Sequence, residues 1–141
     1  MSKLYFAYGS NLNKSQMALR SPTAKALGSA YFVGWRLVFR GVADIERGDD
    51  DSLLPVGIWS IEESDEAALD RYEGVSSGLY RKVEINGMLT YRMNRYSYAR
   101  PSAEYFNTIL NGYRDFGLVE SELYNARDES TFREEEQRIW V

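Results

Sequence analysis

The stretch Tyr5-Phe-Ala-Tyr-Gly-Ser-Asn-Leu12 (YFAYGSNL) starts as an aromatic, apolar run and breaks at its glycine into small polar residues. This pattern predicts a buried strand over Lys3–Tyr8 that leads into a turn. Residues 13–20 (NKSQMALR) can then form a helix of about two turns, which Ser21-Pro22 ends. A turn between a strand and a helix can present backbone N–H groups to an anion or a carbonyl oxygen. The other interpretation is a tight turn capped by the Asn11 side chain.

The clearest strand signal elsewhere is a hairpin centred on Asn86-Gly87. This pair favours a two-residue turn, and the runs on either side, residues 80–85 (YRKVEI) and 88–93 (MLTYRM), read as strands. Residues 30–40 and 53–61 are also strand-like, and a glycine marks a bulge or turn within the first of them. Together with the N-terminal strand, these segments predict about six strands.

Two helices have recognisable ends. Ser64 is a candidate N-cap followed by acidic residues, and its helix is expected to run through Tyr72. Ser102 can cap a later helix whose apolar residues share one face and which Gly117 ends. Residues 119–141 are rich in charge and are expected to be partly helical. The prediction is a single α+β domain over residues 1–141, a small mixed β-barrel of about six strands with peripheral helices.

The composition excludes several classes of function. The net charge of −4 gives no electrostatic footprint for nucleic acid or an anionic membrane. No apolar run approaches the roughly 20 residues of a membrane span. We also expect no secretory signal, and without Cys no disulfides, so the expected location is the cytoplasm. The chain has no His either, which excludes Ser-His-Asp triads and any imidazole base. Proton transfer near neutral pH would therefore need a carboxylate, a Lys or a Tyr.

Glu73 is the candidate for such a proton carrier. It lies in Leu69-Asp-Arg-Tyr-Glu-Gly-Val-Ser-Ser-Gly-Leu-Tyr80, where a predicted helix gives way to a glycine-rich turn. A carboxylate beside apolar neighbours can have a raised pKa and can carry protons at neutral pH. The alternative is a surface glutamate beside a glycine that ends the helix. The spacing alone leaves both interpretations open.

Taken together, the two segments resemble the γ-glutamylcyclotransferase family, which includes γ-glutamylamine cyclotransferases and AIG2-like proteins. The resemblance rests on the Tyr8-Gly-Ser-Asn-Leu12 turn and on the D-x-x-E-G-V-x-x-G-x-Y pattern that ends at Tyr80. It extends over about residues 3–118, through the helix that follows Pro101. Residues 119–141 add nothing to it and form a divergent C-terminal tail.

The resemblance also implies which residues form the site. Glu73 matches the catalytic glutamate of the family's E-G-V sequence. The turn is expected to hold the γ-glutamyl group beside a set of pocket tyrosines. The implied substrate-binding residues are Tyr8, Gly9, Ser10, Asn11, Leu12, Tyr80, Tyr91 and Tyr105. Tyr72 is a departure, since some relatives have a polar residue before the glutamate. The implied partner is a small-molecule γ-glutamyl substrate, with no cofactor and no metal, and the resemblance does not fix the oligomeric state.

The implied reaction suits a chain that lacks His and Cys. The α-amine of the substrate attacks its own γ-carbonyl, and one carboxylate passes the proton to the departing amine, which leaves 5-oxoproline. Two alternatives remain: a non-catalytic member of the same fold that binds a ligand, and a protein-interaction module with an aromatic surface. The sequence does not identify which γ-glutamyl compound is cyclised.

Overall fold

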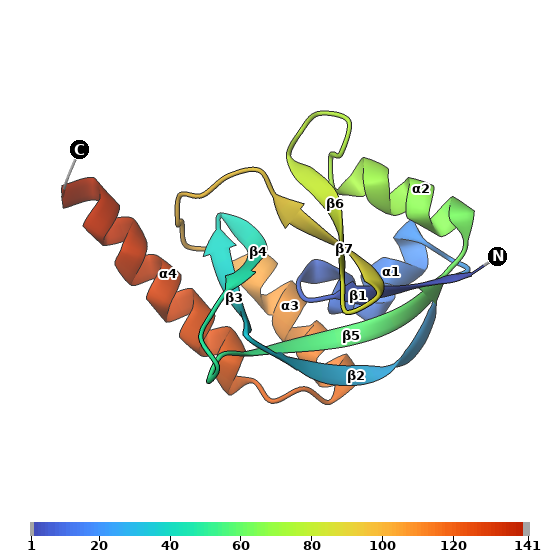
Figure 1. Cartoon of the computed structure of the whole chain (residues 1–141), viewed down its shortest axis with the longest axis horizontal. Coiled ribbons are helices and arrows are strands. Elements are labelled where there is room, and N and C mark those ends of the chain that lie inside the picture. Colours follow the sequence, from blue (N-terminus) through green and yellow to red (C-terminus); the bar gives the residue numbers. More distant parts are fainter. Residues whose placement is uncertain (1, 140–141) are drawn as a thin grey trace.

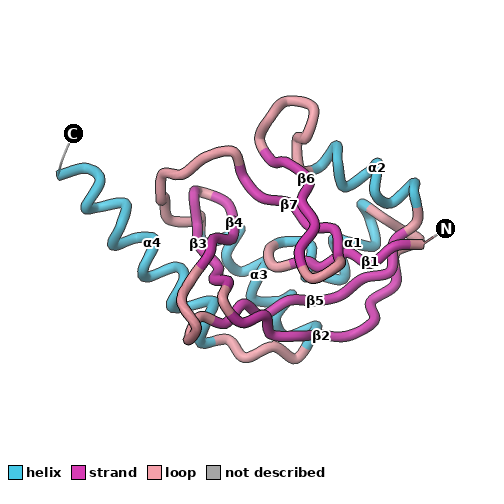
Figure 2. Tube along the Cα trace, in the orientation of Figure 1, coloured by secondary structure: helices cyan, strands magenta, loops and turns pink. Residues whose placement is uncertain are grey.

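The computed structural model describes residues 2–139, with the strands gathered at the centre and the helices around them (Figures 1 and 2). In chain order the elements are β1 (Lys3–Ala7), the 3-10 helix η1 (Ser10–Leu12), α1 (Lys14–Arg20), β2 (Lys25–Val33), β3 (Trp35–Arg40), β4 (Val42–Arg47), β5 (Leu53–Ile61), α2 (Glu63–Tyr72), β6 (Tyr80–Ile85), β7 (Met88–Met93), α3 (Ala103–Phe116) and α4 (Ser121–Ile139).

The strand that leads to the YGSN turn is the central strand of the larger sheet. The strand order is β2-β5-β1-β7-β6, with β1 antiparallel to β5 and parallel to β7. Pairing with β5 runs from Lys3 opposite Ile61 to Ala7 opposite Gly57. The last three residues of β1 are buried. The turn therefore projects from a strand that is paired on both sides.

A second sheet of two antiparallel strands, β3 and β4, lies beside the end of the first. The chain passes from β2 to β3 through Gly34, whose φ of 85° lies in the region that favours glycine. The Asp44 carboxylate of β4 accepts the Met93 backbone N–H at 2.9 Å, and the Tyr80 hydroxyl donates to the Ala43 carbonyl at 2.5 Å. The predicted α+β class is confirmed. Within residues 2–139, hydrogen bonds of this kind, and no continuous backbone ladder, connect the two sheets.

The number of strands differs from the prediction. The described residues form seven strands where about six were expected. The run 30–40 splits at its positive-φ glycine, and residues 42–47 pair with β3 as a strand of their own. Strand β2 also begins earlier, at Lys25, in a stretch whose largely exposed side chains give no apolar pattern. An exposed edge strand is held by its backbone pairing with β5, which side-chain periodicity does not reveal.

Local turn and cap chemistry behaves largely as predicted. Asn86 and Gly87 have φ values of 53° and 78° and join β6 to β7. Ser102 accepts the N–H of Tyr105 at 3.1 Å at the start of α3, and Gly117 ends that helix with a φ of 67°. These three predictions are confirmed. Each could be made from the sequence because it depends on a few neighbouring residues.

The N-cap predicted for α2 is wrong. The helix begins at Glu63, and its N-cap is Glu62 rather than Ser64. The Asp65 carboxylate reaches back to accept the Glu62 N–H at 2.9 Å and also accepts the Thr23 hydroxyl at 2.7 Å. The long-range contact favours this earlier start, and it cannot be read from the local cap signal.

Helix α3 fixes the position of the turn after β1. Its residues Ile109 and Tyr113 are fully buried in the core. Gly112 faces Leu12 so closely that an added Cβ would lie 2.6 Å from the Leu12 Cβ and 2.7 Å from its carbonyl carbon. A glycine is therefore needed for α3 to pack directly on η1.

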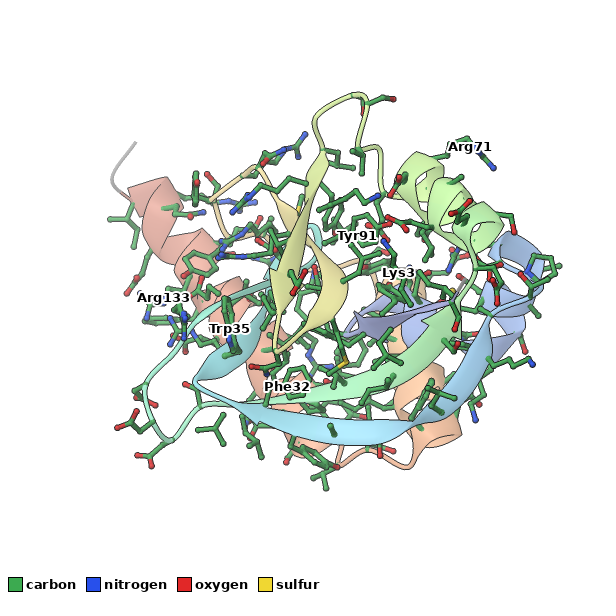
Figure 3. The ribbon with its side chains drawn as sticks, turned by 45° about the vertical axis from the view of Figure 1, so that its right-hand side comes forward. Lys3, Phe32, Trp35, Arg71, Tyr91 and Arg133 are labelled. Atoms are coloured by element: carbon green, nitrogen blue, oxygen red, sulfur yellow. The ribbon has the colours of Figure 1, made fainter. Side chains whose placement is uncertain are left out.

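The C-terminal tail is more regular than expected. Helix α4 packs on β3, where the Ser130 hydroxyl accepts the Phe39 N–H at 2.9 Å, and it extends beyond the rest of the fold (Figure 1). Its side chain Arg133 and the exposed Arg71 of α2 lie at opposite ends of the molecule (Figure 3). None of the helices in the described part of the chain has both the length and the apolar character of a membrane span.

Candidate active site

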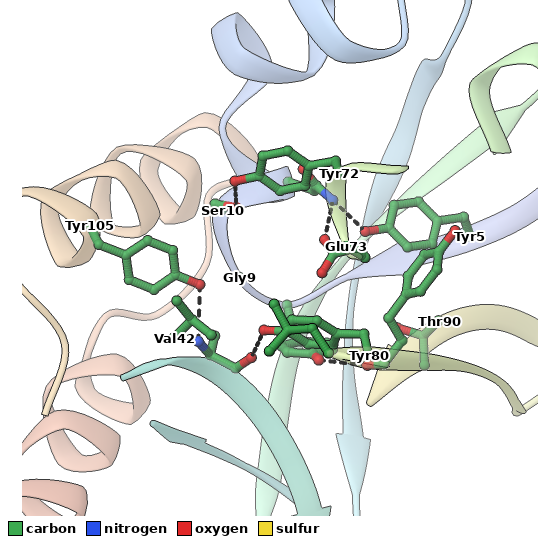
Figure 4. A pocket seen from close by; sticks show the side chains of 14 residues that line it. Tyr5, Gly9, Ser10, Val42, Tyr72, Glu73, Tyr80, Thr90 and Tyr105 are labelled. Atoms are coloured by element: carbon green, nitrogen blue, oxygen red, sulfur yellow. Dashed lines mark hydrogen bonds between the residues drawn. The ribbon is translucent and has the colours of Figure 1, made fainter. Parts of the chain in front are cut away.

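A cavity of about 220 Å³ lies where β1 ends, between the 3-10 helix, the C-terminus of α2 and the β6–β7 hairpin (Figure 4). It is lined by Tyr5, Tyr8, Gly9, Ser10, Asn11, Val42, Ala43, Tyr72, Glu73, Leu79, Tyr80, Thr90, Tyr91 and Tyr105. The mixture of aromatic walls with a few polar groups is typical of a small-molecule site.

The YGSN turn forms one side of the cavity. After β1, residues 10–12 make a single 3-10 turn in which the Leu12 N–H donates to the Gly9 carbonyl at 3.0 Å. Such a turn leaves its first N–H groups, here those of Ser10 and Asn11, without partners inside the helix. A Cβ on Gly9 would lie 3.0 Å from the Ala43 Cβ, so glycine lets β1 approach β4 closely.

Glu73 is the C-cap residue of α2. Gly74 follows with a φ of 64°, and its N–H donates to the Arg71 carbonyl at 3.2 Å. The Val75 N–H donates to the Asp70 carbonyl at 3.0 Å, which completes a Schellman motif. The E-G-V sequence thus ends the helix and also contributes a residue to the cavity. The glycine does end the helix, but Glu73 lines the cavity and is only partly exposed.

The surroundings of Glu73 favour a carboxyl group that titrates near neutral pH. Burial raises the pKa of Glu73 from 4.5 to about 7, while the charge of Arg20 and the hydrogen bond from Asn11 act in the opposite direction. The Asn11 side-chain amide donates to Glu73 Oε1 at 3.2 Å. A group with this pKa can both accept and release a proton at neutral pH.

Two tyrosines meet at the backbone of β4. The Tyr80 hydroxyl donates to the Ala43 carbonyl, and the Tyr105 hydroxyl accepts the Ala43 N–H at 3.0 Å (Figure 4). Burial raises the pKa of Tyr80 and Tyr105 above the ordinary value, so both are neutral at pH 7. Because Tyr105 acts as the acceptor in this contact, its own O–H proton can be directed to a ligand.

The opposite wall is built by three further tyrosines. The Tyr8 hydroxyl donates to the Tyr91 carbonyl at 2.6 Å, and the Tyr91 hydroxyl donates to the Asp70 carboxylate at 2.7 Å. Tyr5 and Tyr91 pack edge to face, with ring centroids 5.9 Å apart. Burial raises the pKa of each of these tyrosines as well. The wall is therefore uncharged and fixed in position.

The structure brings together all but one of the residues expected at the site. Glu73, the four residues of the YGSN turn and the three expected pocket tyrosines line the same cavity. Leu12 does not line it. It is fully buried, and its side chain fills the space beside Gly57 and Gly112.

Several lining residues could not be anticipated from the sequence. Tyr5 and Thr90 lie on strands whose pairing the sequence does not specify, and Tyr72 stood out only as a departure from the family pattern. The charge that lowers the pKa of Glu73 is that of Arg20 on α1, and nothing in the sequence indicated this residue. In the described part of the chain, no group of three or more carboxylates is placed to bind a metal ion.

Comparisons with known proteins point to one family. Residues 5–113 match the family model described as gamma-glutamyl cyclotransferase, AIG2-like. The chain is similar to proteins named gamma-glutamylcyclotransferase from Bos taurus (31% identity over 83% of this chain and 73% of the relative) and from Homo sapiens (32%, with the same coverage). A solved structure named gamma-glutamyl cyclotransferase superposes with a TM-score of 0.76 at 28% identity, covering 89% of this chain and 86% of the other.

Proposed function

This chain belongs to the gamma-glutamyl cyclotransferase, AIG2-like family and is a γ-glutamylcyclotransferase-type enzyme, and we propose that Glu73 is its proton carrier. In this proposal a γ-glutamyl amide is cyclised to 5-oxoproline with release of an amine or amino acid. The 5-oxoproline product and the cytoplasmic location are part of this proposal.

One observation carries the proposal. The partly buried carboxyl of Glu73 faces the YGSN turn and accepts a hydrogen bond from the Asn11 side-chain amide, in a cavity whose buried tyrosines are neutral. With its pKa near 7, the carboxyl is poised between its two protonation states at neutral pH. Among the described residues that line the cavity, Glu73 is the carboxylate whose pKa burial brings close to neutrality.

The proposed reaction uses these groups in a fixed order. The γ-glutamyl group binds against the turn with its α-amine near Glu73. The amine nitrogen attacks the γ-carbonyl carbon and closes a five-membered ring, while the Glu73 carboxylate takes the proton that the amine loses. The protonated carboxyl then returns that proton to the departing nitrogen as the C–N bond to the leaving group breaks. No water is consumed.

The charge that develops on the γ-carbonyl oxygen needs hydrogen-bond donors. The N–H groups of Ser10 and Asn11 and the O–H of Tyr105 are the candidates that border the cavity. The leaving group is expected in a second hollow, which shares Ser10, Tyr72 and Tyr105 with the main cavity and continues towards the N-terminal part of α3. Bound in this way, the substrate is held in a ring-closing conformer, which supplies part of the rate enhancement.

The central test is Glu73→Gln, assayed with a panel of γ-glutamyl compounds by the formation of 5-oxoproline. Turnover should fall by a factor of at least about 100, since general acid–base catalysis is lost while shape is kept. Glu63→Gln is the matched control, because Glu63 is exposed in the first turn of the same helix and should be silent. A Glu73→Gln variant within a few-fold of wild-type activity would exclude Glu73 as the proton carrier.

A substrate variant separates cyclisation from hydrolysis. An N-acetylated γ-glutamyl amide has no free amine, so it should not be turned over. Oxygen-18 from labelled water should not enter the first-formed product of the unmodified substrate. Turnover of the acetylated compound, or incorporation of the label, would contradict the mechanism.

A further inference from the structure

A chain of hydrogen bonds connects Arg20, in the last turn of α1, to Glu73. Arg20 Nη1 donates to Asn11 Oδ1 at 2.7 Å. The amide nitrogen of Asn11 donates to Glu73 Oε1 at 3.2 Å and to the Tyr5 hydroxyl oxygen at 3.0 Å (Figure 4). Asn11 is buried, its contact with Tyr5 is buried as well, and its contacts with Arg20 and Glu73 are partly buried.

The guanidinium of Arg20 is itself held in place. It lies over the ring of Tyr72, with Cζ 3.6 Å from the ring centroid, and its second terminal nitrogen donates to Gln16. Tyr72 in turn contacts the Ser10 hydroxyl at 3.1 Å through its own hydroxyl. A planar group fixed on a ring face and by a hydrogen bond to Gln16 loses little further freedom when it binds Asn11.

The contact with Arg20 decides which way the Asn11 amide is oriented. An Asn side chain has one accepting end and one donating end, and a rotation by half a turn exchanges them. Arginine can only donate, so it selects the orientation in which Asn11 Oδ1 faces α1. The donating end then faces Glu73. In the opposite orientation, a carbonyl oxygen would face the carboxylate and would repel its charged form.

We propose that Arg20 is a positioning residue that acts through Asn11, fixing the orientation of that amide so that an N–H group is directed at the Glu73 carboxylate. The inference deepens the proposed function and rests on it for its catalytic meaning. It assigns no contact with substrate to Arg20.

The pH dependence follows from the groups around Glu73. The titratable and charged groups that face it come from the elements around it: Tyr5 from β1, Tyr8 just after β1, Arg20 from α1, Tyr72 from α2, Tyr80 from β6 and Tyr105 from α3. Arg20 brings the cation and the oriented amide, which both favour the charged carboxylate and partly offset its burial. Loss of Arg20 should therefore raise the pKa of Glu73.

The test compares Arg20→Met, Arg20→Lys and Arg71→Gln. Met removes donor and charge but can still pack on Tyr72, and Lys restores a cationic donor. Arg71→Gln removes the same charge from an exposed residue close to Glu73 in sequence. Arg71 points outward from α2 (Figure 3) and does not line the cavity. In Arg20→Met the acid limb of kcat/KM should move up by about one pH unit, which is about tenfold lower activity below both midpoints. Arg20→Lys should recover most of the shift, and Arg71→Gln should not move it.

A second readout does not depend on activity. The carboxyl carbon of Glu73, followed by NMR and assigned with Glu73→Gln, should titrate at a higher midpoint in Arg20→Met than in the wild type. In the wild type, the side-chain N–H signals of Asn11 should titrate with the midpoint of Glu73, because they donate to it. This measurement stands even if Arg20→Met does not fold.

The outcomes separate the two proposals. A wild-type protein that forms no 5-oxoproline from any γ-glutamyl compound would refute the proposed function, while the NMR titration would still decide the role of Arg20. A folded Arg20→Met variant with an unchanged Glu73 midpoint, or Asn11 signals that ignore the Glu73 titration, would overturn the positioning role. A purely structural role would lower the melting temperature or kcat without moving either midpoint.

Discussion

Glu73 should make the stability of this protein depend on pH, and Glu73→Gln should remove that dependence. Burial raises the pKa of Glu73 from 4.5 to about 7. Since one pH unit is worth about 1.4 kcal/mol, this difference corresponds to about 3 kcal/mol. Between these two pH values the folded protein keeps a proton on Glu73 that the unfolded chain has released. The free energy of unfolding should therefore fall as the pH rises through this window.

The assay is urea unfolding of wild type, Glu73→Gln and Glu63→Gln at several pH values from about 4.5 to about 7.5. Gln keeps the shape of the side chain and cannot titrate. Relative to wild type, Glu73→Gln should gain about 3 kcal/mol in stability across the window, whereas Glu63→Gln should track the wild type. Other titrating groups affect all three proteins and cancel in the difference. A difference between wild type and Glu73→Gln that stays constant with pH would refute the burial of this carboxyl.

Two further substitutions test how the site is supported. Gly74→Ala should cost about 1 kcal/mol in stability, because its φ of 64° disfavours a side chain and an added Cβ would lie 2.9 Å from the Ser77 hydroxyl oxygen. The substitution should also lower kcat by displacing Glu73. An unchanged melting temperature and kcat would contradict this role. Asp44→Ala should cost about 3 kcal/mol in urea unfolding, since it leaves buried Arg40 without its 2.7 Å ion pair. A loss below about 1 kcal/mol would show that the hydrogen bonds of Arg40 to Glu46 and to the Tyr96 carbonyl suffice.

Features that depend on a few neighbouring residues were predictable from the sequence. The Asn86-Gly87 turn, the Ser102 cap and the stop at Gly117 follow from backbone preferences that act within one turn of chain. The absence of His and Cys likewise restricts proton transfer to a small set of side chains, because composition alone decides which titratable groups the chain contains. The cap of α2 was mispredicted because a local signal at Ser64 competed with a contact to Thr23, which lies far away in the sequence.

The candidate site depended on tertiary structure for its geometry and its charge state. Asn11 and Glu73 lie 62 positions apart and meet only because β1 sits at the centre of its sheet while α2 ends beside it. Leu12 shows the limit of motif reasoning: it belongs to the same turn, but the close approach of Gly112 directs it into the core. The sequence by itself determined that a carboxylate was available next to a helix-ending glycine. Only the fold decided that Glu73 is largely removed from water and that Arg20 binds Asn11, the residue that donates to Glu73. Desolvation and charge pairing arise from residues that distant segments bring together.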